Sequence, residues 1–175
     1  DNNTFADATI AASLALAARQ WTGPSGKDSY ENQAKQMMRD LWRKSVVTID
    51  GTHYMLATDM YSDIHTDQYY VLNASFLTPT WYELFAEFDQ ENPWSELASS
   101  SYDILRQYLV PDGKIIEGVV LELNRENGSL TVQGSEVTTD SPKQLLYQGD
   151  PYQSVWFAAL GSQWFSSEGA KEYLA

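Results

Sequence analysis

The stretch from residue 71 to residue 97 mixes aromatic rings with polar side chains in a way that suits sugar binding. "VLNASFLTPTWYELFAEFDQENPWSEL" places its rings beside Asn73, Ser75 and Glu83. A sugar offers flat C–H faces that pack on aromatic rings, and its hydroxyls need carboxylate, amide or hydroxyl partners. A groove for a glycan needs both kinds of surface, and this stretch supplies both.

A hydrophobic core is the competing interpretation of the same stretch. Helical spacing puts Trp81, Phe85 and Phe88 on one face, and such a stripe more often packs inside a protein than against a ligand. We therefore favour core packing for these three rings. Phe76 precedes the helix in a turn, and it is the better candidate for a contact with substrate.

An acidic segment, "DMYSDIHTD" at residues 59–67, is the one candidate for binding a hard cation. It has neither the glycine nor the terminal glutamate of an EF-hand loop, so a solvated acidic loop is the favoured interpretation. The two histidines, His53 and His65, lack the spacing of a metal-binding pair. No phosphate-binding loop or nucleophile elbow is visible, and we predict neither a metal nor a cofactor.

Charge and composition narrow the range of partners. The 24 acidic residues outnumber the 11 basic ones and give a formal charge of −13, which would repel nucleic acid and anionic lipid surfaces. No apolar run is long enough to span a bilayer. Cysteine is absent, which excludes disulfides and thiolate metal sites and weakly favours an exported bacterial protein. The chain begins at Asp1 rather than Met, so we expect a processed or truncated product.

The periodicity of apolar residues predicts a mainly helical chain with two small β-hairpin insertions. The segment at 4–21 is apolar on most faces and should be buried on most faces. The hairpins are expected at 45–57 and 114–134, where Asp-Gly and Asn-Gly pairs favour tight turns. Helices are expected over 4–21, 28–42, 79–89, 94–108, 150–165 and 166–174. No linker interrupts the chain, so we predict a single domain over 1–175.

Three quoted segments carry a resemblance to a known family. They are "DATIAASLALAARQW" (7–21), "NASFLTPTWYELFA" with the Trp and "SYDIL" that follow it (73–105), and "YQGDPYQSVWFAAL" (147–160). In this order they resemble three blocks of glycoside hydrolase family 8, most closely its exopolysaccharide-associated branch. The resemblance implies an (α/α)6 toroid, or the C-terminal half of one. It also implies an inverting endo-glycanase acting on β-1,4-linked polymers.

The first block resembles the family's Thr-Asp-Ala-Asp turn at the head of a helix. "TFAD" keeps Thr4 and Asp7, whereas Phe5 stands where the family has its earlier carboxylate. The resemblance thus makes Asp7 a candidate for contacting substrate at the mouth of the toroid. Physical chemistry alone offers a simpler role for Asp7, as a favourable negative charge in the first turn of a helix.

The second block resembles the family's Asn-Pro-Ser-Tyr turn before a helix that opens with proline. Asn73 and Ser75 are kept, but Ala74 and Phe76 occupy the other two places. The resemblance makes Asn73 and Phe76 candidates for contacting the substrate.

The third block concerns the chemistry. Inversion needs one protonated carboxylic acid and one ionised carboxylate that activates water. The resemblance lays Asp150 on the family's general base and Tyr147 and Tyr152 along the cleft, while Gly149 and Gln153 replace the Tyr and Arg of the motif. Gln153 is accordingly a candidate for binding substrate. As a plain alternative, Asp150 is only an N-cap ahead of Pro151.

The family's general acid is a glutamate in a glycine-rich motif, and this chain holds no glutamate in such a context. We therefore predict that the chain is the C-terminal portion of a larger catalytic domain, with the acid on an N-terminal portion that packs against it.

Two functions stay open on the sequence. The first is a secreted or cell-surface bacterial glycoside hydrolase that cleaves a β-linked polysaccharide, either a β-glucan or an exopolysaccharide. The second is a non-catalytic glycan-binding or scaffold module on the same helical fold, which the departures at Phe5, Gly149 and Gln153 would allow.

Overall fold

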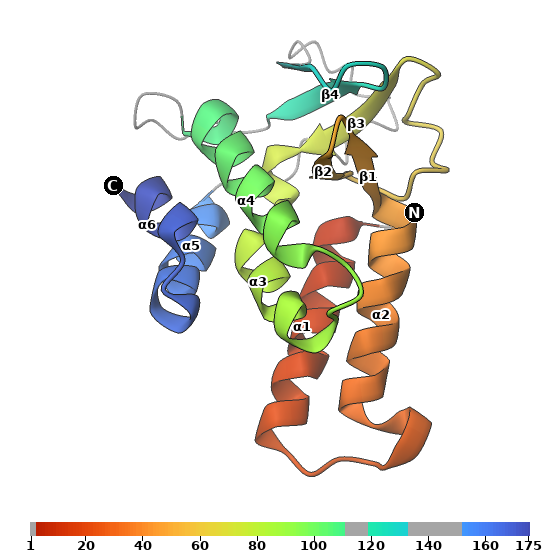
Figure 1. Ribbon diagram of the computed structural model, residues 1–175, viewed down its shortest axis with the longest axis vertical. Coiled ribbons are helices and arrows are strands. Elements are labelled where there is room, and N and C mark those ends of the chain that lie inside the picture. The colour runs from red at the N-terminus through yellow and green to blue at the C-terminus, as the bar shows by residue number, and fades with distance from the viewer. Residues whose placement is uncertain (1–2, 111–118, 133–151) are drawn as a thin grey trace.

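The computed structural model describes residues 3–110, 119–132 and 152–175 (Figure 1). Its helices are α1 (Thr4–Gln20), α2 (Tyr30–Ser45), α3 (Pro79–Phe88), α4 (Trp94–Ile104), α5 (Tyr152–Phe165) and α6 (Glu168–Leu174). Short turns are η1 (Gly26–Asp28), η2 (Ala74–Phe76) and the π-helical η3 (Leu105–Leu109), which continues α4. The strands are β1 (Val46–Ile49), β2 (Thr52–Met55), β3 (Tyr69–Asn73), β4 (Val120–Asn124) and β5 (Leu130–Val132). The helices predicted from the sequence are confirmed over the described residues, with small shifts at their ends.

Side chains next to the helix starts explain where the helices begin. The Asn3 carboxamide oxygen accepts hydrogen bonds from the backbone N–H groups of Phe5 and Ala6, and this caps α1. Ser29 caps α2 in the same way. Pro79 occupies the first turn of α3, where its missing N–H group leaves no bond unmade.

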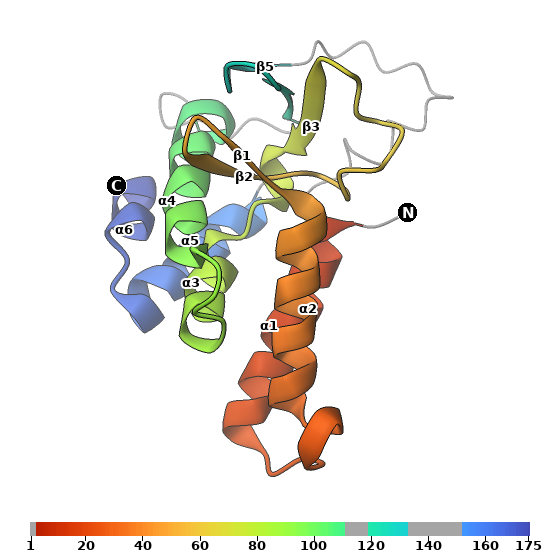
Figure 2. The same cartoon turned by 45° about the vertical axis from the view of Figure 1, so that its right-hand side comes forward.

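The helices form antiparallel hairpins in two rows. α1 pairs with α2, α3 with α4 and α5 with α6, while α1 also contacts α3 and α3 contacts α5. Helices α1, α3 and α5 thus make one row, and their partners α2, α4 and α6 make the other. Figure 2 shows α2 standing in front of α1, and both views place the strands at the upper end of the helices.

Both predicted hairpins are present, and one of them is part of a larger sheet. β1 pairs antiparallel with β2 around the turn at Asp50 and Gly51, which both adopt positive φ. β4 pairs antiparallel with β5, as predicted, but β4 also pairs along its other edge with β3. β3 was not predicted, because its partner lies far along the chain and no turn joins the two.

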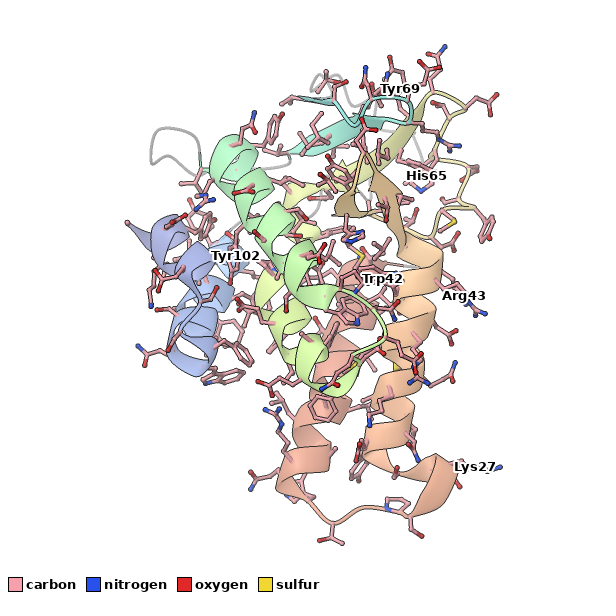
Figure 3. All side chains as sticks on the ribbon, in the orientation of Figure 1. Lys27, Trp42, Arg43, His65, Tyr69 and Tyr102 are labelled. Carbon is pink, nitrogen blue, oxygen red and sulfur yellow. The ribbon has the colours of Figure 1, made fainter. Side chains whose placement is uncertain are left out.

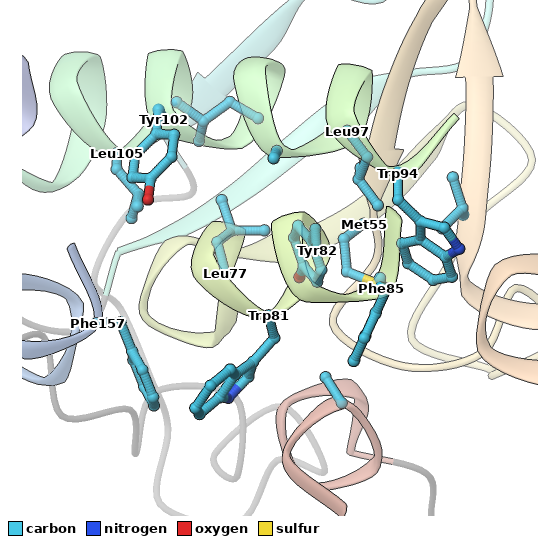
Figure 4. Packing of buried hydrophobic residues seen from close by; sticks show 14 of the residues in the cluster. Met55, Leu77, Trp81, Tyr82, Phe85, Trp94, Leu97, Tyr102, Leu105 and Phe157 are labelled. Carbon is cyan, nitrogen blue, oxygen red and sulfur yellow. The ribbon is translucent and has the colours of Figure 1, made fainter. Parts of the chain in front are cut away.

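Aromatic side chains fill the core between α2, α3 and α4 (Figure 4). The ring of Trp94 is fully buried, and its centroid lies 5.0 Å from that of Phe85 and 4.9 Å from that of Trp42. Trp81 and Phe85 are both buried in this cluster, and Phe88 packs against it. The core interpretation of this stripe is therefore confirmed.

Candidate functional site

The starts of α1, α3 and α5 meet at one end of the first row. Phe5 lies in the first turn of α1, and its ring centroid is 6.3 Å from that of Phe76, three positions before the start of α3. The same ring is 6.1 Å from Phe157, in the second turn of α5. Segments from the first, second and third sequence blocks are thus brought together by direct ring contacts.

The start of α1 is tied to the segment that leads towards β3. The Thr4 hydroxyl donates to the carbonyl oxygens of Leu56 at 2.8 Å and Ala57 at 3.2 Å, and Thr4 is 1% exposed. The Ala57 N–H group in turn donates to the carbonyl oxygen of Val71 at 3.0 Å. These bonds fix the position of the first turn of α1 relative to β3, and hence of Phe5 relative to Phe76.

Asp7 points to a different side of α1 from Phe5. It lines a pocket of about 240 Å³ whose other walls are all from α2, including Asp40 and Lys44. Burial raises the pKa of the Asp7 carboxyl, and the nearby charge of Lys44 partly offsets that rise. Residues two apart do not share a helix face, so a contact of Phe5 with α3 and α5 turns Asp7 away from them.

Asn73 and Phe76 are both buried where β3 leads into α3. Asn73 is 1% exposed, and its side-chain oxygen accepts the N–H group of Ser75 at 2.8 Å, which shapes the turn η2. Phe76 is 8% exposed and packs with apolar residues of the strands and of the segment before β3. Neither side chain is open to solvent in this arrangement, and their contact with substrate stays a prediction.

Tyr152 and Gln153 occupy the first turn of α5 and are both exposed. Asp150 and Tyr147, the predicted base and one predicted cleft residue, lie outside the described residues, as does Gly149. Because α5 begins at Tyr152 and Phe157 contacts Phe5, the chain enters α5 at the end of the row where the other two blocks meet.

Glu83 of α3, which the sequence analysis named only as a polar neighbour of the aromatic rings, is a half-buried carboxylate. Its Oε2 atom is shielded from solvent and has no hydrogen-bond partner among the described residues. Burial raises its pKa, and a hydrogen bond with Ser167 partly offsets the rise. A raised carboxyl pKa is typical of general acids, but Glu83 lies against Gly161, well inside α5, rather than at the helix starts.

Comparison with known proteins decides the family. A sequence profile described as "Glycosyl hydrolases family 8" matches residues 1–120, which is more than half of the chain. The chain belongs to glycosyl hydrolase family 8. It is 29% identical over 170 residues to Endoglucanase C of Ruminiclostridium cellulolyticum, and this match covers 97% of the chain and 32% of that protein. It is 28% identical to Endoglucanase 2 of Ruminiclostridium josui, with the same two shares covered.

Solved structures of family 8 proteins share the fold. The endoglucanase Cel10 from Klebsiella pneumoniae, a family 8 glycosyl hydrolase, aligns with a TM-score of 0.63 at 21% identity, over 94% of this chain and 52% of that one. An endo-β-1,4-glucanase of family 8 from an Achatina fulica gut metagenomic library aligns with a TM-score of 0.62, also at 21% identity, over 94% and 50%. The predicted fold class, that of the (α/α)6 toroid family with small strand pairs, is confirmed.

The chain spans about a third of the length of the curated family 8 relatives it matches, and about half of the solved structures above. Within the described residues, no helix is long and apolar enough to cross a membrane.

Proposed function

We propose that the protein is an inverting glycoside hydrolase that cleaves a β-linked polysaccharide at the shared start of α1, α3 and α5. The observation that carries the proposal is the ring contact of Phe5 with both Phe76 and Phe157 in a member of family 8. It gathers the three sequence blocks that resemble the family's substrate-binding and catalytic segments. The printed names of the matched relatives, endoglucanases, support a β-glucan as the substrate.

In this proposal Asp150 is the general base and activates water. It precedes the start of α5 by two positions in the sequence, and α5 begins where the other two blocks meet. Tyr147, Tyr152 and Gln153 flank it in the sequence and are proposed to contact the sugar, together with Asn73 and Phe76. The role of Asp7 is proposed to be indirect, because its side chain faces α2.

The general acid is proposed to come from polypeptide outside these 175 residues, which form a single domain at the C-terminal side of a larger catalytic unit. Exposed apolar side chains on helices of the first row support this. Ile10 of α1 is 50% exposed, and Trp156 and Trp164 of α5 are 58% and 48% exposed. α5 carries no charged residue, and a helix apolar on most faces is normally covered on most faces. Further helices of the same fold would cover these rings. A secreted or cell-surface location is part of the proposal.

A second candidate is a glycan-binding module without hydrolysis, and Phe5 is the observation that favours it. The structure turns Phe5, rather than Asp7, towards the shared helix starts. At the position of the "TFAD" turn that faces the site, this chain therefore presents a ring and no carboxylate.

The test compares the complete protein with its Asp150→Asn variant on β-1,4-glucan, chitosan and xylan, with the anomer of the product followed by NMR. Asparagine caps a helix about as well as aspartate, so folding should be preserved. Loss of a general base should lower the rate by roughly 10²- to 10⁴-fold. Asp28→Asn is the matched control, because Asp28 is exposed in η1 at the far end of the helices.

Three results would separate the candidates. An inverted product from the parent and a slow Asp150→Asn variant support the hydrolase. Sugar binding without product from the parent supports the binding module. An Asp150→Asn variant that is folded and as fast as Asp28→Asn would remove Asp150 from the mechanism.

A further inference from the structure

The segment at residues 57–68, which we call the covering loop, lies over Phe76. Ile64 of this loop is 8% exposed and belongs to one apolar cluster with Phe76, Val71 and Val120. Phe5 packs against the same cluster. A ligand that contacts the ring of Phe76 therefore needs the covering loop to move away first.

His65, labelled in Figure 3, joins the covering loop to β3 through Nδ1 and bonds within the loop through Nε2. Nδ1 lies 3.0 Å from the backbone nitrogen of Val71, which can only donate, so Nδ1 is the acceptor. Nε2 lies 3.0 Å from the carbonyl oxygen of Asp59, which can only accept, so Nε2 carries the proton. This pair of bonds requires the neutral ring with its proton on Nε2.

The surroundings of His65 favour that neutral ring. The pKa of His65 is lowered overall, mainly because the ring is partly buried, and the positive charge of Arg125 lowers it further. The hydrogen bond to the Asp59 backbone and the charge of the Asp59 carboxylate act in the opposite direction. The ring also packs edge-on against Tyr70 of β3, with the centroids 5.5 Å apart. Arg125 in turn lies over the ring of Tyr70, 3.9 Å from its centroid.

We propose that His65 is an acid-sensitive latch, which holds the covering loop on β3 while neutral and releases it from Phe76 on taking up a proton. The proton binds to Nδ1, the atom that accepts the Val71 N–H group. Two N–H groups then face each other, so that bond is lost, while the bond from Nε2 to Asp59 remains. The loop stays attached at its start, through Ala57, and at its end, where the Thr66 N–H group donates to the Tyr69 carbonyl oxygen at 2.9 Å, so the part between them, with Ile64, moves away from Phe76.

The consequence for function is a site that opens on acidification. The latch itself rests on the contacts of His65 alone, whereas a gain in glycan binding rests on the function proposed above. The opening should follow the protonation of His65, below its ordinary pKa of 6.5. Above that pH the covering loop shields Phe76 and the site is closed.

The experiment follows the complete protein by NMR between pH 7.5 and 5.0. Ring nitrogen shifts should show His65 with its proton on Nε2 at pH 7.5 and doubly protonated at low pH. Hydrogen exchange of the Val71 amide, corrected for its intrinsic pH dependence, should speed up by roughly 2- to 10-fold on acidification, as expected for the loss of one hydrogen bond. The amide of Leu84, in the middle of α3, should stay protected.

Two variants serve as controls. His65→Phe keeps a flat ring but cannot accept a hydrogen bond, so the Val71 amide should exchange fast at every pH. His53→Phe removes the other histidine, which pairs with Thr48 in the β1–β2 hairpin, and should behave as the parent does.

The latch would be refuted by a Val71 amide whose protection does not change while His65 takes up a proton. A His65 that stays neutral down to pH 5.0, or a loss of protection shared equally by Leu84, would also overturn it. β-1,4-Glucan oligosaccharides added at pH 7.5 and 5.5 test the consequence for function. If the Val71 amide responds but no sugar binds at either pH, the latch stands and the proposed function fails.

Discussion

Gly161 in the middle of α5 offers a sharp test of how the α5–α6 hairpin packs against α3 and α4. A Cβ atom added there would lie 2.7 Å from the Thr80 hydroxyl oxygen and 2.8 Å from the Tyr102 hydroxyl oxygen. Neither group can move freely. The Thr80 hydroxyl donates to the carbonyl oxygen of Phe157 at 2.5 Å and lies 3.2 Å from the Tyr102 oxygen, and all of these atoms are buried.

Two opposing effects determine how much Gly161→Ala changes the free energy of unfolding. Alanine favours the middle of a helix over glycine by about 0.5–1 kcal/mol, which alone would make the variant more stable. Inserting a methyl group into a close-packed contact typically costs about 1–3 kcal/mol. We therefore expect Gly161→Ala to be less stable than the parent by about 1–2 kcal/mol. Because the helix must shift, Tyr152 and Gln153 at its start should move as well, and the rate on glycan should fall.

Urea unfolding of the parent, Gly161→Ala, Thr80→Ala and the double variant measures this directly. Removing the Thr80 hydroxyl makes room for the new methyl group, so Gly161→Ala should cost much less, or become stabilising, in the Thr80→Ala background. A Gly161→Ala protein that is about 1 kcal/mol more stable than the parent would contradict the reasoning. A loss of stability from Gly161→Ala that is equal in the parent and in the Thr80→Ala protein would also contradict it.

Three further outcomes are expected. Asp89→Asn should lower stability at pH 7 by roughly 1–3 kcal/mol in thermal or urea unfolding, because the buried carboxylate accepts the Trp94 indole N–H group at 3.0 Å. Burial raises the pKa of Asp89, but hydrogen bonds, including that from Trp94, and the charge of Arg39 lower it overall in the folded protein. The stability difference between the parent and Asp89→Asn should therefore be present above about pH 3.8 and fade as the pH falls through the lowered pKa of the folded state. Phe85→Ala, at a fully buried ring, should cost about 3–5 kcal/mol in urea unfolding. In the complete protein Trp156 should be protected from oxidative footprinting, whereas Trp21, 64% exposed beyond the other end of α1, should stay reactive.

The sequence predicted the elements well because their signals are local. Capping residues, a proline in the first turn of α3 and Asp-Gly or Asn-Gly turns act within a few positions of the backbone they shape. Strand β3 was missed although Tyr69, Tyr70 and Val71 are residue types that favour strands, because its partner is β4, which pairs with it from Tyr69 with Asn124 to Asn73 with Val120. Nothing in the five residues of β3 specifies a partner that far along the chain.

The site was predicted less completely. The direction in which a side chain points from its helix or turn depends on tertiary packing, which the sequence does not show directly. Asp7 and Phe5 are two positions apart, and only the packing of α1 between α2 and α3 decides that Phe5 faces the shared helix starts. Phe76 was singled out as a substrate-contacting ring in the turn before a helix, yet Ile64 from a separate loop packs against it. Asp150, on which the chemistry depends, stays a prediction.

The shared direction of α1, α3 and α5 also affects whether a carboxyl group near their starts is suited to act as the general base or as the general acid. The N-terminal end of a helix carries a partial positive charge, and α1, α3 and α5 all begin at the end where Phe5 meets Phe76 and Phe157. Such an end stabilises an ionised carboxylate and lowers its pKa. An inverting hydrolase needs that state for its base, whereas its acid must hold a proton and requires the opposite shift. The shared helix starts therefore suit a base that enters with α5, as proposed for Asp150. They do not suit the acid, which in the proposal is supplied from polypeptide outside these 175 residues.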